Sequence, residues 1–96
     1  LLAGQGNHID MSPHRQWFVT DSYYNQTPVK ITLFKRGRTE PTAVLDAHDD
    51  GVPTWDLRAH ANPVFSRDGA RVYFVRPLGE RQVCAVRADV KDLVRG

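Results

Sequence analysis

The sequence lacks most of the features that assign a chain to a special class of protein. It holds one cysteine, Cys84, in 96 residues, which excludes an internal disulfide. Its apolar runs stay well below the roughly 18 residues of a membrane-spanning helix. The initial LLAGQGNH has neither the basic segment nor the apolar core of a signal peptide. We therefore expect no membrane span and a soluble chain, cytoplasmic or periplasmic, cut within a domain.

Charge of one sign is also scarce. Thirteen Lys and Arg residues oppose eleven Asp and Glu residues, for a formal net charge of +2. The arginines are scattered rather than gathered into a basic tract, so we expect no nucleic-acid partner. The sequence also has no glycine-rich phosphate loop and no pair of carboxylates at a spacing suited to acid–base catalysis.

Sustained apolar spacing at three and four residues is absent, which argues against long helices. Short alternating runs separated by turn residues predict β-strands instead. In residues 29–34 the alternation places Val29, Ile31 and Leu33 on one face. The predicted strands are 9–11, 16–20, 29–34, 42–45, 63–65, 71–76 and 82–87, and the tail at 90–94 is either a helical turn or a further strand.

Two stretches of the chain are variants of each other. HIDMSPHRQWFVT spans residues 8–20 and NPVFSRDGARVYFV spans residues 62–75, and they align when Ser12 is placed on Ser66. Each has an apolar residue before the serine, a polar turn after it, and then an apolar run rich in aromatics. Repeats with a period of some tens of residues predict stacked structural units rather than a self-contained globule.

The turns of the two units differ in one respect. Asp68 and Gly69 form a strong hairpin signal in the second unit, because glycine accepts the positive φ of a tight turn. The first unit has His14 and Arg15 at the equivalent positions, so we expect its turn to use another conformation or to carry strain. The serine of each turn is predicted to be a structural residue rather than a nucleophile.

A serine, aspartate and glycine turn that recurs once per four-stranded unit is typical of β-propellers, whose blades span roughly 40–50 residues. The sequence therefore predicts an all-β fold of about two four-stranded antiparallel blades. We place blade one at about 7–47, a linker loop at 48–58 and blade two at about 60–94. Because such a piece has open sheet edges, we expect its partners to be the remaining blades or further copies of itself.

These segments resemble a known family of propellers. Residues 66–74 resemble the repeat of Tol-type propellers, and the whole chain resembles the last two blades of oligogalacturonate lyase-like propellers (pectate lyase family 22). The resemblance is carried by GNHIDMSPHRQWFVTDSYY, HANPVFSRDG and RQVCAVR, which are similar to the family segments GHxxxSPDGRW with TDxY, HPHPxFSPDG and RQVYVVD. It implies a seven-bladed propeller that binds manganese and cleaves acidic (pectic) oligosaccharides by β-elimination.

The resemblance also implies a set of metal ligands. His8 and His60 match two histidines of the family, whereas Asn62 replaces a third histidine and Leu57 replaces a glutamine. His8 and Asn62 are equivalent positions of neighbouring blades, and His60 lies on the same side as Asn62 if that segment is extended. We therefore expect these three side chains to meet at one channel mouth. The family's catalytic base lies on other blades, so we expect this fragment alone to be inactive.

Each candidate has a plainer alternative. For His8 and His60, the alternative to metal binding is a hydrogen bond from the histidine to loop backbone at the start of a strand. Asp56 and Arg58 flank the lost glutamine position and are candidates for binding an acidic sugar, since arginine pairs with carboxylates in bidentate fashion; the alternative is a surface ion pair. For the whole protein, the alternatives are a non-catalytic scaffold or glycan- or protein-binding module, and the propeller gate of a prolyl-oligopeptidase-type peptidase.

Overall fold

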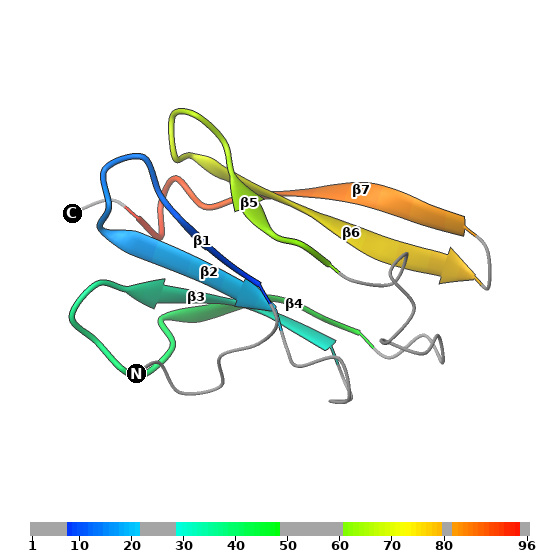
Figure 1. Cartoon of the computed structure of the whole chain (residues 1–96), viewed down its shortest axis with the longest axis horizontal. Coiled ribbons are helices and arrows are strands. Elements are labelled where there is room, and N and C mark those ends of the chain that lie inside the picture. Colours follow the sequence, from blue (N-terminus) through cyan, green and yellow to red (C-terminus); the bar gives the residue numbers. More distant parts are fainter. Residues whose placement is uncertain (1–7, 22–28, 49–60, 80–81, 95–96) are drawn as a thin grey trace.

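The computed structural model describes residues 8–21, 29–48, 61–79 and 82–94, and these form two antiparallel β-sheets and no helix (Figure 1). The first sheet has the order β1-β2-β3-β4, and the second has the order β5-β6-β7. The predicted all-β, antiparallel fold is confirmed. The strands are β1 (Ile9–Met11), β2 (Trp17–Asp21), β3 (Val29–Lys35), β4 (Ala43–His48), β5 (Val64–Phe65), β6 (Arg71–Gly79) and β7 (Gln82–Asp89).

The second sheet has three strands in the described residues, whereas a four-stranded unit was predicted. After β7 ends, the N–H of Val90 donates to the carbonyl of Ala70 at 2.8 Å. The N–H groups of Leu93 and Val94 then donate to the carbonyl of Val90 at 2.9 and 3.0 Å. The tail at 90–94 is therefore a turn, because buried Val90 ties it to the core and directs it away from the edge of β7.

The two sheets share one register. Adding 54 to the residue numbers of a Cα pair in the β1–β2 or β2–β3 ladder gives the matching pair in the second sheet, wherever such a pair exists. This offset is the separation of Ser12 and Ser66. The equivalent pairs are Met11–Phe18 and Phe65–Val72, then Val19–Leu33 and Tyr73–Arg87. The repeat in the sequence is therefore also a repeat of strand pairing, carried through three strands of each sheet.

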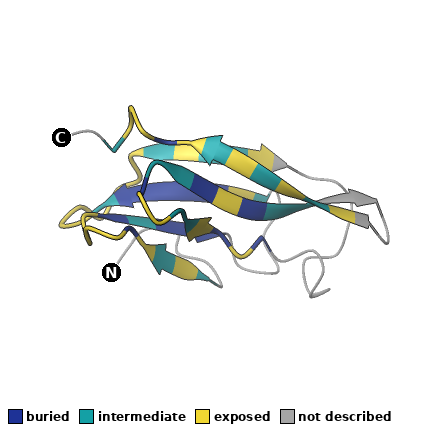
Figure 2. Cartoon of the chain, turned by 90° about the horizontal axis from the view of Figure 1, so that it is seen from above, coloured by how far each residue is buried: buried dark blue, intermediate teal, exposed yellow. Residues whose placement is uncertain are grey.

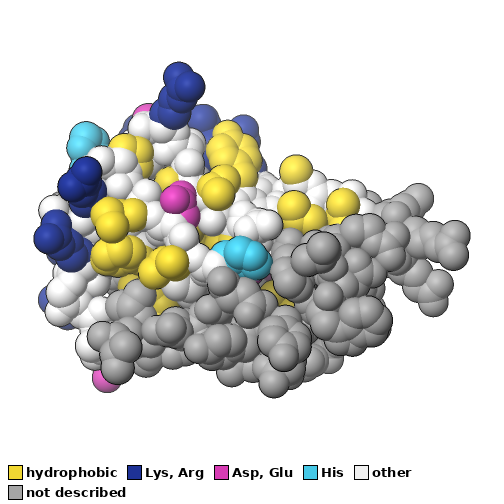
Figure 3. Space-filling model, viewed as in Figure 1, with side chains coloured by type: hydrophobic (Ala, Val, Ile, Leu, Met, Phe, Trp, Pro, Cys, Tyr) yellow, Lys and Arg dark blue, Asp and Glu magenta, His cyan; other side chains and the backbone are white. Residues whose placement is uncertain are grey.

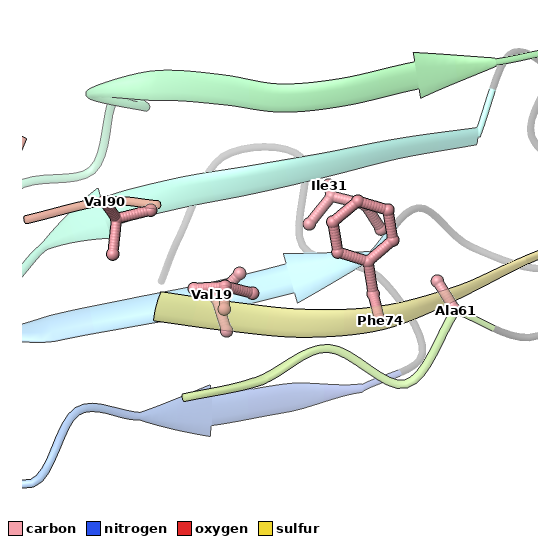
Figure 4. Packing of buried hydrophobic residues seen from close by; sticks show 6 residues of the cluster. Val19, Ile31, Ala61, Phe74 and Val90 are labelled. Atoms are coloured by element: carbon pink, nitrogen blue, oxygen red, sulfur yellow. The ribbon is translucent and has the colours of Figure 1, made fainter. Parts of the chain in front are cut away.

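The two sheets stack face to face, and the core lies between them (Figure 2). Val19 and Ile31 of the first sheet meet Val72 and Phe74 of the second, and the ring of Phe74 lies against Ile31 (Figure 4). The residue equivalent to Val19 in the second sheet is Tyr73, which lies on the opposite, exposed face. The stacking is therefore head to tail, with a different face of each repeat unit at the interface.

Strand β3 is more buried than its alternation predicted. Ile31 and Leu33 are fully buried on one face, as predicted, but Thr32 and Phe34 on the other face are also buried. Phe34 pairs with Phe18 across the β2–β3 ladder, and aromatic cross-strand pairs stabilise a sheet by contact across the pleat. Strand β3, which lies between β2 and β4, therefore buries side chains on both of its faces.

No described residue lies in a helix long and apolar enough to cross a membrane.

Candidate functional site

His8 and Asn62, two of the predicted metal ligands, lie at the same end of neighbouring strands. His8 directly precedes β1, and Asn62 precedes β5 by two residues. The carboxylate of Asp10 on β1 accepts the backbone N–H of Phe65 on β5 at 2.7 Å, which holds the two strands side by side. The end of the sheets that carries these two residues is called the His8 end below.

His8 is held by the carboxylate of Asp21, the last residue of β2. Its backbone N–H donates to Oδ1 of Asp21 at 2.8 Å, and its ring Nδ1 lies 2.7 Å from Oδ2. The Asp21 side chain is 3% exposed and that of His8 is 31% exposed. One buried carboxylate therefore fixes both the main chain and the ring of a histidine that still reaches solvent.

The strand register explains why Asp21 meets His8. Ile9 pairs with Thr20, so the next pair outward is His8 with Asp21, and the N–H of Asp21 donates to the carbonyl of His8 at 3.4 Å. Alternation then places Asp21 on the same face as Val19, which faces the second sheet. Asp21 was not among the residues predicted from the sequence, although the antiparallel pairing of residues 8–11 with 18–21 was a usable signal.

Asn62 does not have an extended backbone. It is exposed and has a φ of 48°, a left-handed conformation that asparagine tolerates better than most residues. The prediction that His60 lies on the same side as Asn62 was conditional on an extended segment, and Asn62 itself is not extended. His60 itself, with Asp56, Leu57 and Arg58, lies outside the described residues.

The His8 end carries some of the side-chain groups that a metal ion would need as ligands. An imidazole oriented by a carboxylate fits metal binding in kind, because a histidine ligand usually gives its second ring N–H to such a group. The amide oxygen of Asn62 is a further donor of a weaker type. In the described ranges, no three His, Cys, Asp or Glu side chains gather around one point suited to a metal ion.

The opposite end of the sheets is formed by hairpin turns, and it is called the turn end below. In the second turn, Oγ of Ser66 donates to Oδ1 of Asp68 at 2.6 Å and accepts the N–H of Arg71 at 3.1 Å. The N–H of Ala70 also donates to Oδ1 of Asp68, at 3.0 Å. The Ser66 hydroxyl, followed by this backbone N–H, holds the pKa of Asp68 below its ordinary value of 3.8.

The first turn has the same shape with fewer polar contacts. Ser12 accepts the N–H of Trp17 on its Oγ at 3.2 Å, and its own N–H donates to the carbonyl of Trp17 at 2.9 Å. Arg15 has a φ of 60°, close to the 73° of its counterpart Gly69. Of the two expectations for this turn, strain is therefore the outcome. Both serine hydroxyls bind hairpin backbone, which confirms their structural role.

A hollow of about 250 Å³ lies between the two turns, and sequence reasoning did not identify it. Both repeat units contribute to it. A Cβ added to Gly69 would lie 3.4 Å from Cδ of Pro13, which shows how closely the two turns approach. The ammonium of Lys35 lies 5.8 Å from the centroid of the Trp17 ring. The lining residues are Ser12, His14, Gln16, Trp17, Lys35, Asp68, Gly69 and Val94.

Comparison with protein-family models, with curated proteins and with solved structures found no match to this chain in any of the three.

Proposed function

We propose that the chain is two repeat units of a β-propeller whose His8 end binds acidic oligosaccharides with the help of a divalent metal ion. The observation that carries the proposal is the double contact of Asp21 with the backbone and ring of His8. The sequence resemblance to oligogalacturonate lyase-like propellers supplies the substrate class and manganese. The substrate would be a uronic-acid oligosaccharide, and the reaction of the parent protein would be β-elimination.

The role of Asp21 in this proposal is to orient a ligand. A carboxylate on Nδ1 fixes the imidazole tautomer in which Nε2 is the ring nitrogen through which His8 would bind a metal ion. Because Asp21 is almost fully buried, its position is set by β2 rather than by solvent. His8 is then a preorganised donor at the border of the sheets.

Asn62 is the second donor, and it makes this site weaker than one with two imidazoles. Amide oxygens suit manganese in kind, but neutral oxygen donors bind divalent ions less tightly than imidazole or carboxylate groups do. A bound divalent cation would stabilise the negative charge that develops on the uronate carboxylate during elimination. His60, Asp56 and Arg58 remain proposed members of the site, as a ligand and as sugar-binding residues.

The proposal is tested by titrating Mn²⁺ into the ¹⁵N-labelled chain, since bound manganese broadens nearby NMR signals. We expect selective broadening at residues 8–9 and 61–62. His8→Ala should abolish this broadening. Asn62→His should strengthen the binding of Mn²⁺ at least tenfold, since histidine tolerates a left-handed backbone. His14→Ala is the matched control, because His14 is an exposed histidine of the turn end. Uniform weak broadening that is unaffected by His8→Ala would refute a metal site.

The second candidate function is a non-catalytic propeller scaffold or glycan-binding module. The observation that favours it is the backbone contact of Asp21, since a bond to the N–H of His8 closes the β1–β2 ladder whether or not a metal binds. In that case Asp21→Asn lowers the stability of the fold and leaves oligogalacturonide affinity unchanged. In the metal-dependent case, the same substitution and the chelator EDTA both reduce that affinity.

A further inference from the structure

The outer edge of β7 corresponds to an edge that another strand covers in the first sheet. The 54-residue offset that relates the two sheets places β3 (Val29–Lys35) on residues 83–89 of β7. In the first sheet β4 pairs with the outer edge of β3. In the second sheet, no strand of the described ranges lies beyond β7. The two sheets therefore differ at this edge.

The backbone groups at this edge are open. The N–H of Val90 donates to the carbonyl of Ala70, next to β6, and the direction of N–H groups alternates along an antiparallel strand. The N–H and carbonyl groups of Val83, Ala85 and Arg87 therefore point away from β6. Among the residues that the structure describes, no backbone hydrogen bond joins these groups to another segment. Such a row of groups is a template for a further strand.

The side chains of β7 that face the first sheet are incompletely covered. Val72 and Phe74 of β6 are buried in the core, whereas their cross-strand partners Ala88 and Val86 are only half-buried against it. In the first sheet, Leu45 of β4 packs against the same core from beyond the edge of β3. An apolar side chain on a strand added to β7 would cover the half-buried pair in the same way.

This edge has little of the protection that sheet edges usually carry. Strand β7 has eight residues and no proline, and its two charged side chains, Arg87 and Asp89, lie at one end and approach each other at 3.7 Å. Val83 and Ala85 are exposed on the outer face. Figure 3 shows hydrophobic side chains on the surface in the upper part of the view, where β6 and β7 lie. Exposed edges are commonly protected by short strands, charges or proline.

We propose that the outer edge of β7 binds an extended segment of a partner protein as an added antiparallel strand. Strand β4, with six residues and no proline, shows what kind of segment fits such an edge. Backbone bonds to β7 would supply affinity, and an apolar side chain beside Val86 would supply specificity. The partner segment therefore has about five or six residues, with apolar side chains toward the core. The proposal does not depend on a metal at the His8 end.

The probe is a synthetic peptide with the sequence of residues 42–48 of this chain, titrated into the ¹⁵N-labelled protein. We expect amide shifts at Val83, Ala85 and Arg87, with a dissociation constant of about 1 mM or below, because one strand buries far less surface than a stable complex does. Shifts confined to β3 would mean that the peptide replaces β4, and they would overturn the proposal, as would the absence of any shift.

Two N-methylated forms of the peptide distinguish strand addition from general apolar attraction. Alternate N–H groups of a bound strand face β7, so methylation of one set should abolish binding and methylation of the other should not. Equal binding or equal loss in the two forms overturns the proposal. One form is methylated at the positions of Ala43, Leu45 and Ala47, and the other at those of Val44, Asp46 and His48.

A substitution in the chain tests the same edge. Ala85→Pro removes an outward N–H that β6 does not use, and we expect it to weaken peptide binding roughly tenfold. Ala85→Thr is the matched control, since it keeps the N–H and suits a strand, and it should bind equally well. If Ala85→Pro unfolds, the methylated peptides still decide the question. If Ala85→Pro instead abolishes self-association in sedimentation velocity, the edge is occupied by a second copy and the proposal is wrong.

Discussion

Oδ2 of Asp10 accepts the backbone N–H of Phe65 at 2.7 Å, so the first strand of one repeat unit is joined to the first strand of the next. The register of the β1–β2 hairpin alternates, so Asp10 turns toward the second sheet while Ile9 and Met11 turn away from it. The N–H of Phe65 points away from β6, where the antiparallel ladder has no acceptor for it. The side chain of Asp10 therefore completes a backbone hydrogen bond that the second sheet cannot make by itself.

The contribution of this bond to stability can be measured directly. Asp10→Ala leaves the N–H of Phe65 without its acceptor, and we expect the free energy of unfolding to fall by about 1–3 kcal/mol. Asp10→Asn retains an acceptor oxygen without the charge and should lose less than half as much. Urea denaturation followed by circular dichroism gives both values. Equal losses in the two variants would show that the negative charge, and not the hydrogen bond, is what Asp10 contributes.

The strained turn at Arg15 predicts a stabilising substitution. Its φ of 60° is unfavourable for a residue with a Cβ, whereas glycine adopts it readily, as at the equivalent Gly69. We expect Arg15→Gly to raise the free energy of unfolding by about 0.5–1 kcal/mol, since relief of strain exceeds the added flexibility of the unfolded chain. Thermal denaturation provides the measurement.

A control for that prediction is available in another turn. Gly37 has a φ of 84° and open space around it, so Gly37→Ala introduces the strain alone and should destabilise by about 1 kcal/mol. Gly69→Ala should cost about as much as Gly37→Ala, because its backbone is strained in the same way and its new Cβ would meet Cδ of Pro13 at 3.4 Å, an ordinary van der Waals distance. If Arg15→Gly destabilised the chain, then a contact of the arginine side chain would outweigh the backbone strain.

The turn of the second unit predicts a pH dependence. The Ser66 hydroxyl and the N–H of Ala70 lower the pKa of Asp68 below 3.8 in the folded chain. Because the folded-state pKa is depressed, the resulting stability is fully present above the unfolded value of about 3.9 and is lost as the pH falls through the folded value. Ser66→Ala should raise the pKa of Asp68 toward its ordinary value. NMR titration of the Asp68 carboxyl from pH 2 to 6 measures this shift, and an unchanged pKa in Ser66→Ala would assign the effect to the backbone.

The exposed face of the second sheet predicts self-association. Three large apolar side chains are exposed on this face, Val64, Tyr73 and Val83, at 47, 39 and 45%. Tyr73 is the counterpart of Val19, which lies in the first sheet and is buried against the second sheet. Head-to-tail stacking thus leaves an interface open to another unit. We expect sedimentation velocity to show association that increases with concentration, and the double substitution of Tyr73 and Val83 by Lys to reduce it.

The matched control for association is Gln16→Lys, which adds a charge at an exposed position of a hairpin turn. It should leave the association constant unchanged. If Gln16→Lys weakened association as much as the double substitution did, the effect would be one of net charge. If the chain stayed monomeric at all concentrations, the exposed face of the second sheet would not be an interface between copies.

The local elements were predictable because they depend on neighbours in sequence. Alternation and turn residues placed each of the described strands to within a few residues, and the Asp68 and Gly69 signal predicted its hairpin. The tail at 90–94 is the exception. Its apolar residues suit a strand and a turn equally well, and the bond from Val90 to Ala70 decides for the turn.

The candidate sites were less predictable. Position and motif selected His8 and Asn62, but neither revealed that Asp21 holds His8 or that Asn62 has a left-handed backbone. The hollow beside Trp17 arises where two turns of different units approach, so no window of the sequence contains it. The partners of polar residues such as Asp10 and Asp21 cannot be predicted from the periodicity of the sequence, since strand register and sheet stacking determine them.

The sequence by itself determined the strands, their hairpins and the repeat, because period-two alternation and turn chemistry act over a few residues. Tertiary structure alone decided which face of each sheet is buried. That choice brought Asp10 to a residue 55 positions away, whereas the register of the β1–β2 hairpin brought Asp21 to His8, 13 positions away. The physical reason is that both faces of each unit carry apolar residues, so only the packing of one sheet on the other selects which of them becomes the core.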